Sequence, residues 1–492
     1  MTRRHLLAVA LAACLALTCT PGASGAAGGR PNFILVMADD QGYGDVAYNS
    51  PGTRLQTPVL DAMSRSALRF DRFYAAAPVC SPTRGGVMTG RHPNRFGCFQ
   101  WGNTLRPQEI TIAEALKDAG YTTGHFGKWH LGSGRAESPV SPGNSGFDHW
   151  VSAPNFFDND PLLSHEGKVR QQEGESSMVT VEHALKFITA ATKQSPDKPF
   201  LAVIWFGSPH NPHHGSPELR ELYKDLPERQ AHYFAEITGI DRAMGKLREQ
   251  LRELGIADNT LLWYTSDNGP QGGGNNPLGS AGPFSGRKGE LLEGGIRVPT
   301  IIEWPAVVKA GRATDVPCNS VDIYPTLIDI AGVQVRGQVM PLDGLSIRPL
   351  IEGAHFERDK PIGFWDYASP GVRSNAAVLL KEQHEGKPSS YDDATLSQIT
   401  KQYDESDRSG EAAWMDGDWK LLALPPAAAN KKNPGRSERT FALFNLKNDP
   451  AEKNDLAAKE PQRLEQMKQA LEKWQAGVIR SLNGGDYPRP RN

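Results

Sequence analysis

The sequence predicts an α/β fold in which a large mixed, mostly parallel sheet is sandwiched by helices and followed by a smaller α+β subdomain with an antiparallel sheet. Three continuous apolar runs support this, at residues 33–38, 200–206 and 261–264. Apolar runs without alternation are typical of strands buried on both faces of a parallel sheet. Segments with helical spacing lie between them, so strands and helices alternate along the chain.

The predicted helices rest on apolar spacing and on start and stop signals. In residues 233–254, apolar side chains recur every three or four positions, and Gly255 is placed to end the helix. A coiled coil is the alternative, but the stripe is short and contains two glycines, so we predict an ordinary core-facing helix. Thr57 and Pro58 have the pattern of an N-cap and first turn, which predicts a helix through Leu68.

The chain changes character after about residue 355. Residues 381–412 are polar and lack a sustained apolar period, so we expect a long surface excursion there. Residues 419–424 and 440–444 have the pattern of paired strands, and a helix is expected at about 461–479. This segment forms the predicted α+β subdomain.

The first 26 residues have the pattern of an export signal. Arg3 and Arg4 precede a twelve-residue, largely apolar stretch that is too short to span a bilayer comfortably. The segment partly resembles a twin-arginine signal, and Cys19 leaves lipoprotein anchoring as an alternative. We expect a periplasmic or secreted protein with no stable membrane span. The domains are then a signal peptide at 1–26, an N-terminal domain at 30–355 and a C-terminal subdomain at 356–492.

Length and charge exclude some classes of function. A chain of 492 residues is too long for a minimal binding module. Its formal net charge of −2 gives no overall attraction for nucleic acid or anionic membranes, so we expect no nucleic-acid partner. An anionic substrate must therefore be bound by a local group of basic side chains.

The cysteines do not form a disulfide framework. Two of the five lie in the predicted export signal, which leaves Cys80, Cys98 and Cys318 in the mature chain. Cys98 and Cys318 could pair, and the sequence leaves this open. If they do, Cys80 is the odd thiol.

Polar clusters follow the apolar runs at the predicted strand ends. Asp39 and Asp40 follow the first run, His210 comes shortly after the second, and Asp267 and Asn268 follow the third. Ligand sites of open α/β sheets lie outside the carboxyl ends of the strands, so these clusters should converge. Their oxygen ligands favour Ca²⁺ or Mg²⁺ over zinc. An isolated Asp-Asp pair is more often a turn or a helix cap, but a second acidic pair after another strand argues against that interpretation.

Basic side chains occur in two further segments. Lys128 and His130 are two residues apart, which in an extended chain puts both on one face. Lys288 follows Arg287 in a glycine-rich turn. Surface loops with solvated charges are the alternative for both segments.

The segment Cys80-Ser81-Pro82-Thr83-Arg84, followed by Met88-Thr89-Gly90-Arg91, is the most specific motif in the chain. By itself, such a cysteine is usually a small buried hydrophobic residue or part of a loop. Together with the polar clusters, in chain order, it resembles the type I formylglycine-dependent sulfatases of the alkaline phosphatase-like superfamily. Within that family the chain is most similar to arylsulfatases and N-acetylgalactosamine-6-sulfatase-like enzymes.

The resemblance implies a site for one Ca²⁺ ion and a modified cysteine. Cys80 would be converted to formylglycine (3-oxoalanine) by a maturation enzyme, and Arg84 would hold the modified side chain. Lys128 and His130 would orient and deprotonate it, while His210 and Lys288 would contact the sulfate group and the leaving oxygen. A remaining polar position near residues 155–158 matches only loosely. The calcium ligands would be the modified Cys80 with Asp39, Asp40, Asp267 and Asn268.

The expected activity is that of a sulfuric ester hydrolase that cleaves sulfate monoesters from sulfated carbohydrates or aryl sulfates, as in the breakdown of sulfated polysaccharides. One alternative is a phosphonate or phosphate monoester hydrolase of the same fold. The other is a non-catalytic protein that binds sulfated glycans, in which Cys80 stays a thiol.

Overall fold

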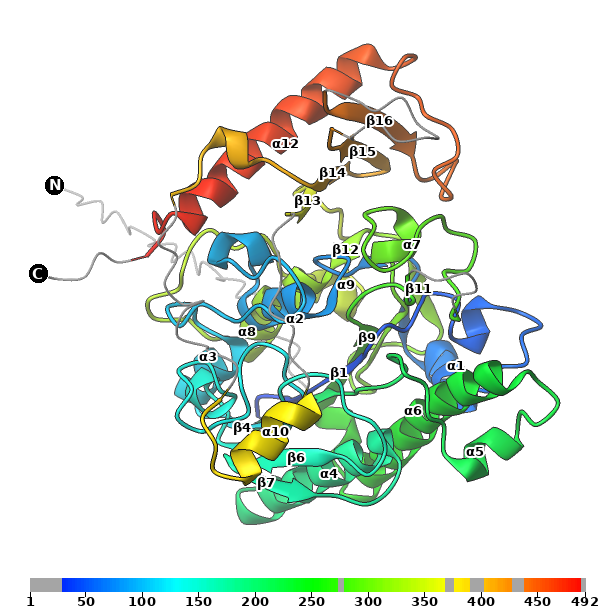
Figure 1. Ribbon diagram of the computed structural model, residues 1–492, viewed down its shortest axis with the longest axis vertical. Coiled ribbons are helices and arrows are strands. Elements are labelled where there is room, and N and C mark those ends of the chain that lie inside the picture. Colours follow the sequence, from blue (N-terminus) through cyan, green and yellow to red (C-terminus); the bar gives the residue numbers. More distant parts are fainter. Residues whose placement is uncertain (1–28, 273–277, 368–375, 390–401, 427–437, 488–492) are drawn as a thin grey trace, which may run out of the picture.

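A ten-stranded mixed sheet forms the centre of the large body in the computed structural model, which describes residues 29–272, 278–367, 376–389, 402–426 and 438–487 (Figure 1). The strand order is β11-β2-β10-β9-β1-β8-β4-β5-β6-β7 among the described residues. The predicted export signal lies outside the described residues.

The central strands of this sheet are parallel to one another. They are β9 (Thr260–Ser266), β1 (Asn32–Ala38), β8 (Phe200–Trp205), β4 (Thr122–Lys128) and β5 (His149–Ala153). Antiparallel pairing joins β10 (Thr300–Glu303) and β2 (Leu68–Phe70) to one side, where β11 (Arg312–Thr314) pairs parallel with β2. On the other side, β6 (Leu162–His165) and β7 (Lys168–Gln171) are antiparallel.

Helices cover both faces of the sheet, which confirms the predicted α/β class. Phe33 and Leu35 of β1 pack towards α2 (Cys80–Thr89), α3 (Ile112–Asp118), α8 (Ile323–Ala331) and α9 (Arg348–Glu352). Ile34 and Val36 pack towards α1 (Pro58–Ser66), α4 (Ser176–Gln194) and α6 (Glu228–Glu253). Because neighbouring residues of β1 are buried on opposite faces, the strand is apolar throughout.

The smaller elements connect these layers. β3 (Phe73–Tyr74) pairs with β12 (Cys318–Asn319), and α5 (Pro217–Glu221) precedes α6. Short 3₁₀ helices are η1 (Ala47–Asn49), η2 (Pro93–Phe96), η3 (Gly143–Ser145), η4 (Ala257–Asn259), η5 (Ser320–Asp322) and η6 (Glu405–Asp407). The three cysteines of the described residues are all buried and free, so Cys98 and Cys318 are not paired in this structure.

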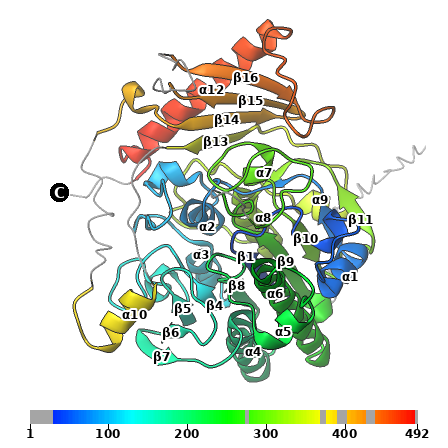
Figure 2. The same cartoon turned by 45° about the vertical axis from the view of Figure 1, so that its right-hand side comes forward.

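A four-stranded antiparallel sheet and a long helix form the C-terminal part (Figure 2). The strands are β13 (Ile362–Asp366), β14 (Glu411–Asp416), β15 (Trp419–Leu424) and β16 (Thr440–Asn445), and α12 (Pro461–Leu482) packs on one face. The other face packs against Tyr74 and the short helix α7 (Glu293–Ile296). The predicted boundary between residues 355 and 356 stays a prediction.

The expected excursion at 381–412 was partly wrong. Helix α10 (Ala376–His384) extends into its start, and β14 begins at Glu411. The buried apolar residues of α10 are Ala376, Leu379 and Leu380, and all three lie before residue 381. Residues 381–412 by themselves therefore show no apolar period. α10 packs against β6 and β7.

Among the described residues, no helix combines the length and the apolar composition needed to cross a bilayer.

Candidate active site

Polar side chains from several strand ends meet at the carboxyl edge of the parallel strands. Asp39 and Asp40 come directly after β1, and Asp267 comes directly after β9, which pairs with β1. Lys128 is the last residue of β4. Gly127 lets β4 pass closely beside β8, because a Cβ atom there would lie 1.9 Å from the carbonyl oxygen of Trp205.

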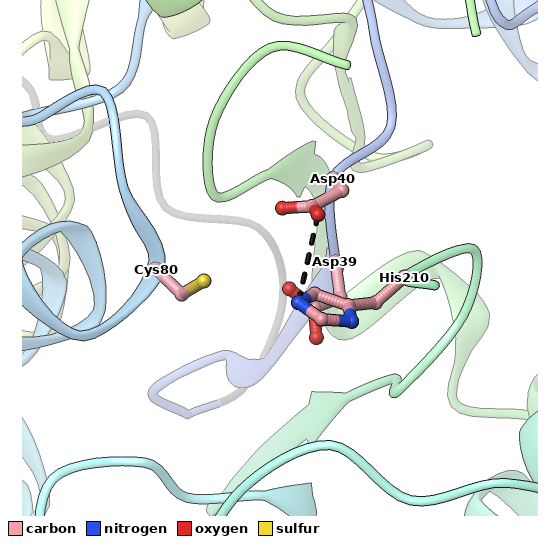
Figure 3. A group of neighbouring side chains, drawn as sticks. All are labelled: Asp39, Asp40, Cys80 and His210. Carbon is pink, nitrogen blue, oxygen red and sulfur yellow. Dashed lines mark ion pairs between the residues drawn. The ribbon is translucent and has the colours of Figure 1, made fainter. Parts of the chain in front are cut away.

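Cys80 is the first residue of α2, and its thiol points towards the carboxylates after β1 (Figure 3). Burial raises the pKa of this thiol to about 12, so it is protonated at neutral pH. Arg84 lies one turn further along α2 and therefore on the same side of the helix. The helix thus presents a neutral thiol and a guanidinium to one site.

Two fully buried cations pair with the carboxylates at the base of the site. Lys128 Nζ lies 2.6 Å from Asp39 Oδ2, and Arg84 Nη2 lies 2.6 Å from Asp267 Oδ2. Burial by itself would raise the pKa of Asp39, but the charges of Lys128, His210 and Arg84 lower it. Asp267 has a raised pKa because burial and the neighbouring Asp39 outweigh Arg84.

Three polar side chains from different segments lie near the Asp40 carboxylate. Lys288 Nζ lies 2.6 Å from its Oδ1, and Asn268 Nδ2 donates a hydrogen bond of 2.8 Å to the same oxygen. His210 Nε2 lies 3.7 Å from Oδ2. Burial opposes ionisation of Asp40, but Lys288 and His210 lower its pKa. Asp40 itself has a φ of 65°, an uncommon backbone conformation that directs its carboxylate to this position.

The acidic cluster fits a hard cation. Candidate ligand atoms of Asp39, Asp40, Cys80 and His210 all lie within 4.8 Å of one another. Within the described residues, the buried oxygens Asp39 Oδ1 and Asn268 Oδ1 have no hydrogen-bond donor, although buried acceptors are normally satisfied. Arg84 Nη2 lies 3.6 Å from Asp39 Oδ1, beyond hydrogen-bond distance. Carboxylate and amide oxygens of this kind are the ligands that Ca²⁺ and Mg²⁺ prefer. Asp267 is not in this group of four, and its oxygens contact Arg84 and the Asp40 backbone N–H.

His130 is a buried imidazole with neither ring nitrogen hydrogen-bonded. Its pKa lies well below the ordinary value, because burial and the charges of Lys128 and Arg84 disfavour the imidazolium. The residue also has a φ of 55°, outside the usual range for a side chain of this size. A neutral imidazole with a free nitrogen can accept a proton.

A cavity of about 270 Å³ joins these groups to solvent-accessible space. Four residues proposed from the sequence line it: Cys80, His130, His210 and Lys288. Asn155, in the loosely matched segment, also lines it, together with Trp101, Asn211 and Gln271.

Trp101 and Gln271 were not among the site residues predicted from the sequence. The available signals were weak: Gln271 follows the Asp267-Asn268-Gly269 strand end, and Trp101 lies in a loop beyond the cysteine motif.

The Sulfatase family matches residues 31–333, which include every site residue described above. The chain belongs to the sulfatase family. This sulfatase is 32% identical over 397 residues to the N-acetylgalactosamine-6-sulfatase of Sus scrofa, covering 73% of this chain and 72% of that protein. It is 30% identical over 363 residues to the ulvan-active sulfatase of Formosa agariphila, covering 67% of each.

Solved structures agree with this assignment. The sulfatase superposes on Ps i-CgsB, solved in complex with k-i-k-neocarrahexaose, with a TM-score of 0.72 and 26% identity, covering 94% of this chain and 98% of that one. The phosphonate monoester hydrolase of Agrobacterium radiobacter shares the fold at 19% identity and a TM-score of 0.58. The chain is therefore a sulfuric ester hydrolase, and the alternative of a phosphonate or phosphate hydrolase is not favoured.

Proposed function

We propose that this sulfatase removes sulfate from sulfated glycans with Ca²⁺ and a formylglycine made from Cys80. The observation that carries the proposal is the Cys80 thiol, which lines one cavity with His130, His210 and Lys288 and faces the acidic cluster. The names of the similar proteins support a glycan substrate, since they describe enzymes for N-acetylgalactosamine 6-sulfate and ulvan.

The unmodified thiol is poorly suited to the reaction, because burial keeps it protonated. The aldehyde hydrate of formylglycine supplies a hydroxyl nucleophile, and bound Ca²⁺ supplies positive charge for the sulfate oxygens. The residues proposed to hold the ion are Asp39, Asp40, Asp267 and Asn268, together with the modified Cys80. The donor-free Asp39 Oδ1 and Asn268 Oδ1 support this set.

The other side chains bind the anion and move protons. Lys128 and Lys288 bring positive charge to a buried site, where it acts on a sulfate ester more strongly than in water. His130, whose ring nitrogens have no hydrogen-bond partner among the described residues, accepts a proton from a hydroxyl group of the modified Cys80. His210 or Lys288 donates a proton to the leaving alkoxide or phenoxide oxygen. Arg84 holds the modified side chain from the next turn of α2.

Two measurements on one purified sample test the proposal. Mass spectrometry of the Cys80 peptide should show the formylglycine form, and an aryl sulfate should be hydrolysed much faster than the matching aryl phosphate. A sample that contains only the Cys80 thiol and has no activity would support the glycan-binding alternative instead. Faster hydrolysis of the phosphate would support the phosphatase alternative.

We also propose that the protein is exported and that a maturation enzyme acts on it before it folds. The export pattern of residues 1–26 supports a periplasmic or secreted location. Cys80 is 1% exposed, so an enzyme can reach its side chain only in an unfolded or partly folded chain. Cell fractionation of the full-length protein, with the N-terminus of the mature form sequenced, tests the export.

A further inference from the structure

A second cavity lies directly beside the active-site cavity. Its volume is about 390 Å³, and Phe156 and Pro212 form part of its lining. The residues that precede them in the chain, Asn155 and Asn211, line the active-site cavity. The Phe156 ring also stacks on the imidazole of His210, with ring centroids 5.1 Å apart. The two cavities therefore share a wall made by these two dipeptides.

The lining of the second cavity is apolar and acidic. Its described lining contains Phe156, Leu162, Pro212 and Leu380, but no lysine, arginine or histidine. It carries two carboxylates, from Asp158 and Asp160. The Asp158 side chain is 33% exposed and is hydrogen-bonded to His214.

The first cavity is basic only at the reacting end. Its remaining described lining is neutral and comes from Trp101, Asn155, Asn211 and Gln271. The buried oxygen Gln271 Oε1 has no hydrogen-bond donor, so it can accept a hydrogen bond from a substrate hydroxyl. Thus, apart from His130, His210 and Lys288 at the reacting end, the described lining of the two cavities contains no cationic side chain for another anionic group of the substrate.

We propose that the substrate is an oligosaccharide in which a neutral sugar with a single sulfate occupies the first cavity and a neutral, unsulfated neighbour occupies the second. The proposal rests on the proposed function. Sugar hydroxyls donate to the carboxylates, and the apolar face of the ring packs on Phe156 and Pro212. In the second cavity, a uronate or a second sulfate meets the carboxylates of Asp160 and of Asp158, the latter paired with His214. The described lining of this cavity includes no lysine, arginine or histidine. The volume of the second cavity is typical of small-ligand sites, and the first cavity is slightly smaller.

The test compares kcat/KM for four substrates: an aryl sulfate, a monosulfated neutral monosaccharide, its disaccharide with a neutral neighbour, and the same disaccharide with a uronate neighbour. The neutral disaccharide should exceed the monosaccharide by about tenfold, since a second occupied cavity adds binding energy of about 1.4 kcal/mol. The kcat/KM for the uronate disaccharide should be about fivefold lower than that for the neutral disaccharide, as one partly screened charge repulsion predicts.

Two variants separate the contributions of shape and charge. Ala377 is exposed and lines the second cavity, so Ala377→Trp should fill it and remove the gain for the disaccharide while leaving aryl sulfate hydrolysis unchanged. Val378→Trp is the matched control, because Val378 is 50% exposed on the same helix but is not part of the lining. Asp158→Asn combined with Asp160→Asn should abolish the discrimination against the uronate.

Each failure has a distinct signature. Equal kcat/KM for monosaccharide and neutral disaccharide, with normal aryl sulfate hydrolysis, would overturn this inference and leave the proposed function intact. A preference for the uronate disaccharide would do the same. Loss of activity on all four substrates, with Cys80 modified, would overturn the proposed function and this inference with it.

Discussion

Lys420, in β15 of the C-terminal sheet, lies 3.0 Å from Glu293 at the start of α7, and both side chains are fully buried. Lys420 Nζ is also 2.8 Å from Glu452 Oε1, while Glu452 Oε2 accepts a hydrogen bond of 2.6 Å from the Glu293 backbone N–H. Burial opposes the charge of Lys420, but the two carboxylates raise its pKa. The ammonium thus joins the C-terminal sheet to the segment that follows Lys288.

Replacing Lys420 should destabilise the protein strongly. In Lys420→Met, Glu452 stays buried without its cation and Glu293 keeps only Arg297, 3.2 Å away. The free energy of unfolding should therefore fall by about 3–5 kcal/mol. Denaturant unfolding measures this loss. Lys459→Met, at an exposed position, should change stability by less than about 0.5 kcal/mol. A Lys420→Met protein as stable as the wild type would show that this buried network contributes little.

Replacing Cys80 by serine should stop turnover but not binding. A serine hydroxyl attacks the ester but leaves a stable sulfate ester, so Cys80→Ser should release at most one equivalent of product per enzyme. Rapid-quench kinetics with an aryl sulfate would detect this single turnover. Cys98→Ala removes another buried thiol and should keep multiple turnovers. Sustained turnover by Cys80→Ser would contradict the proposed role of formylglycine.

Chelation should inactivate the enzyme reversibly. Removal of the divalent cation leaves the carboxylates of the acidic cluster without a bound ion. The kcat should then fall on the order of 10²-fold or more, as when a main electrostatic contact to the transition state is lost. Added Ca²⁺ should restore the wild type but not Asp39→Asn, which loses a proposed ligand. Asp225→Asn, at a position 75% exposed, should respond like the wild type. Full activity after exhaustive chelation would argue against a metal.

The stability of the protein should fall at acidic pH because the Asp343 carboxylate becomes protonated. Arg95 donates two hydrogen bonds to its carboxylate, at 2.6 and 2.9 Å. Burial would raise the pKa of Asp343, but Arg95 holds it well below the ordinary value. A lowered folded pKa contributes stability that is complete above the unfolded pKa of about 4 and is lost as pH falls towards the folded pKa.

The variant Asp343→Asn isolates this contribution. It should be less stable than the wild type by about 3–5 kcal/mol at neutral pH, because Arg95 stays buried without its counter-ion. Its stability should also decline less steeply below pH 4 than that of the wild type. Asp329→Asn breaks an exposed pair with Arg348 and should leave the acid profile nearly unchanged. Identical acid profiles for Asp343→Asn and the wild type would contradict the assignment.

Much of the site could be predicted because many of its residues directly follow predicted strands in the chain. Asp39 and Asp40 directly follow a buried strand, and so do Asp267 and Asn268; parallel strands bring their carboxyl ends to one edge. The cysteine motif contains Cys80 and Arg84 within one helical turn. The positions of Trp101 and Gln271 could not be predicted, because they come from loops whose course depends on the packing around them.

The sequence by itself determined the alternation of strands and helices, the family and the chemistry of the acidic and basic clusters, because these depend on residue type, spacing and chain order. Only the tertiary structure decided that Lys420 is buried rather than solvated, since its partner Glu293 is 127 residues away in the chain. It also placed Phe156 against His210 and the second cavity beside the first. Such contacts join distant segments through packing, which leaves no periodic signal in the sequence.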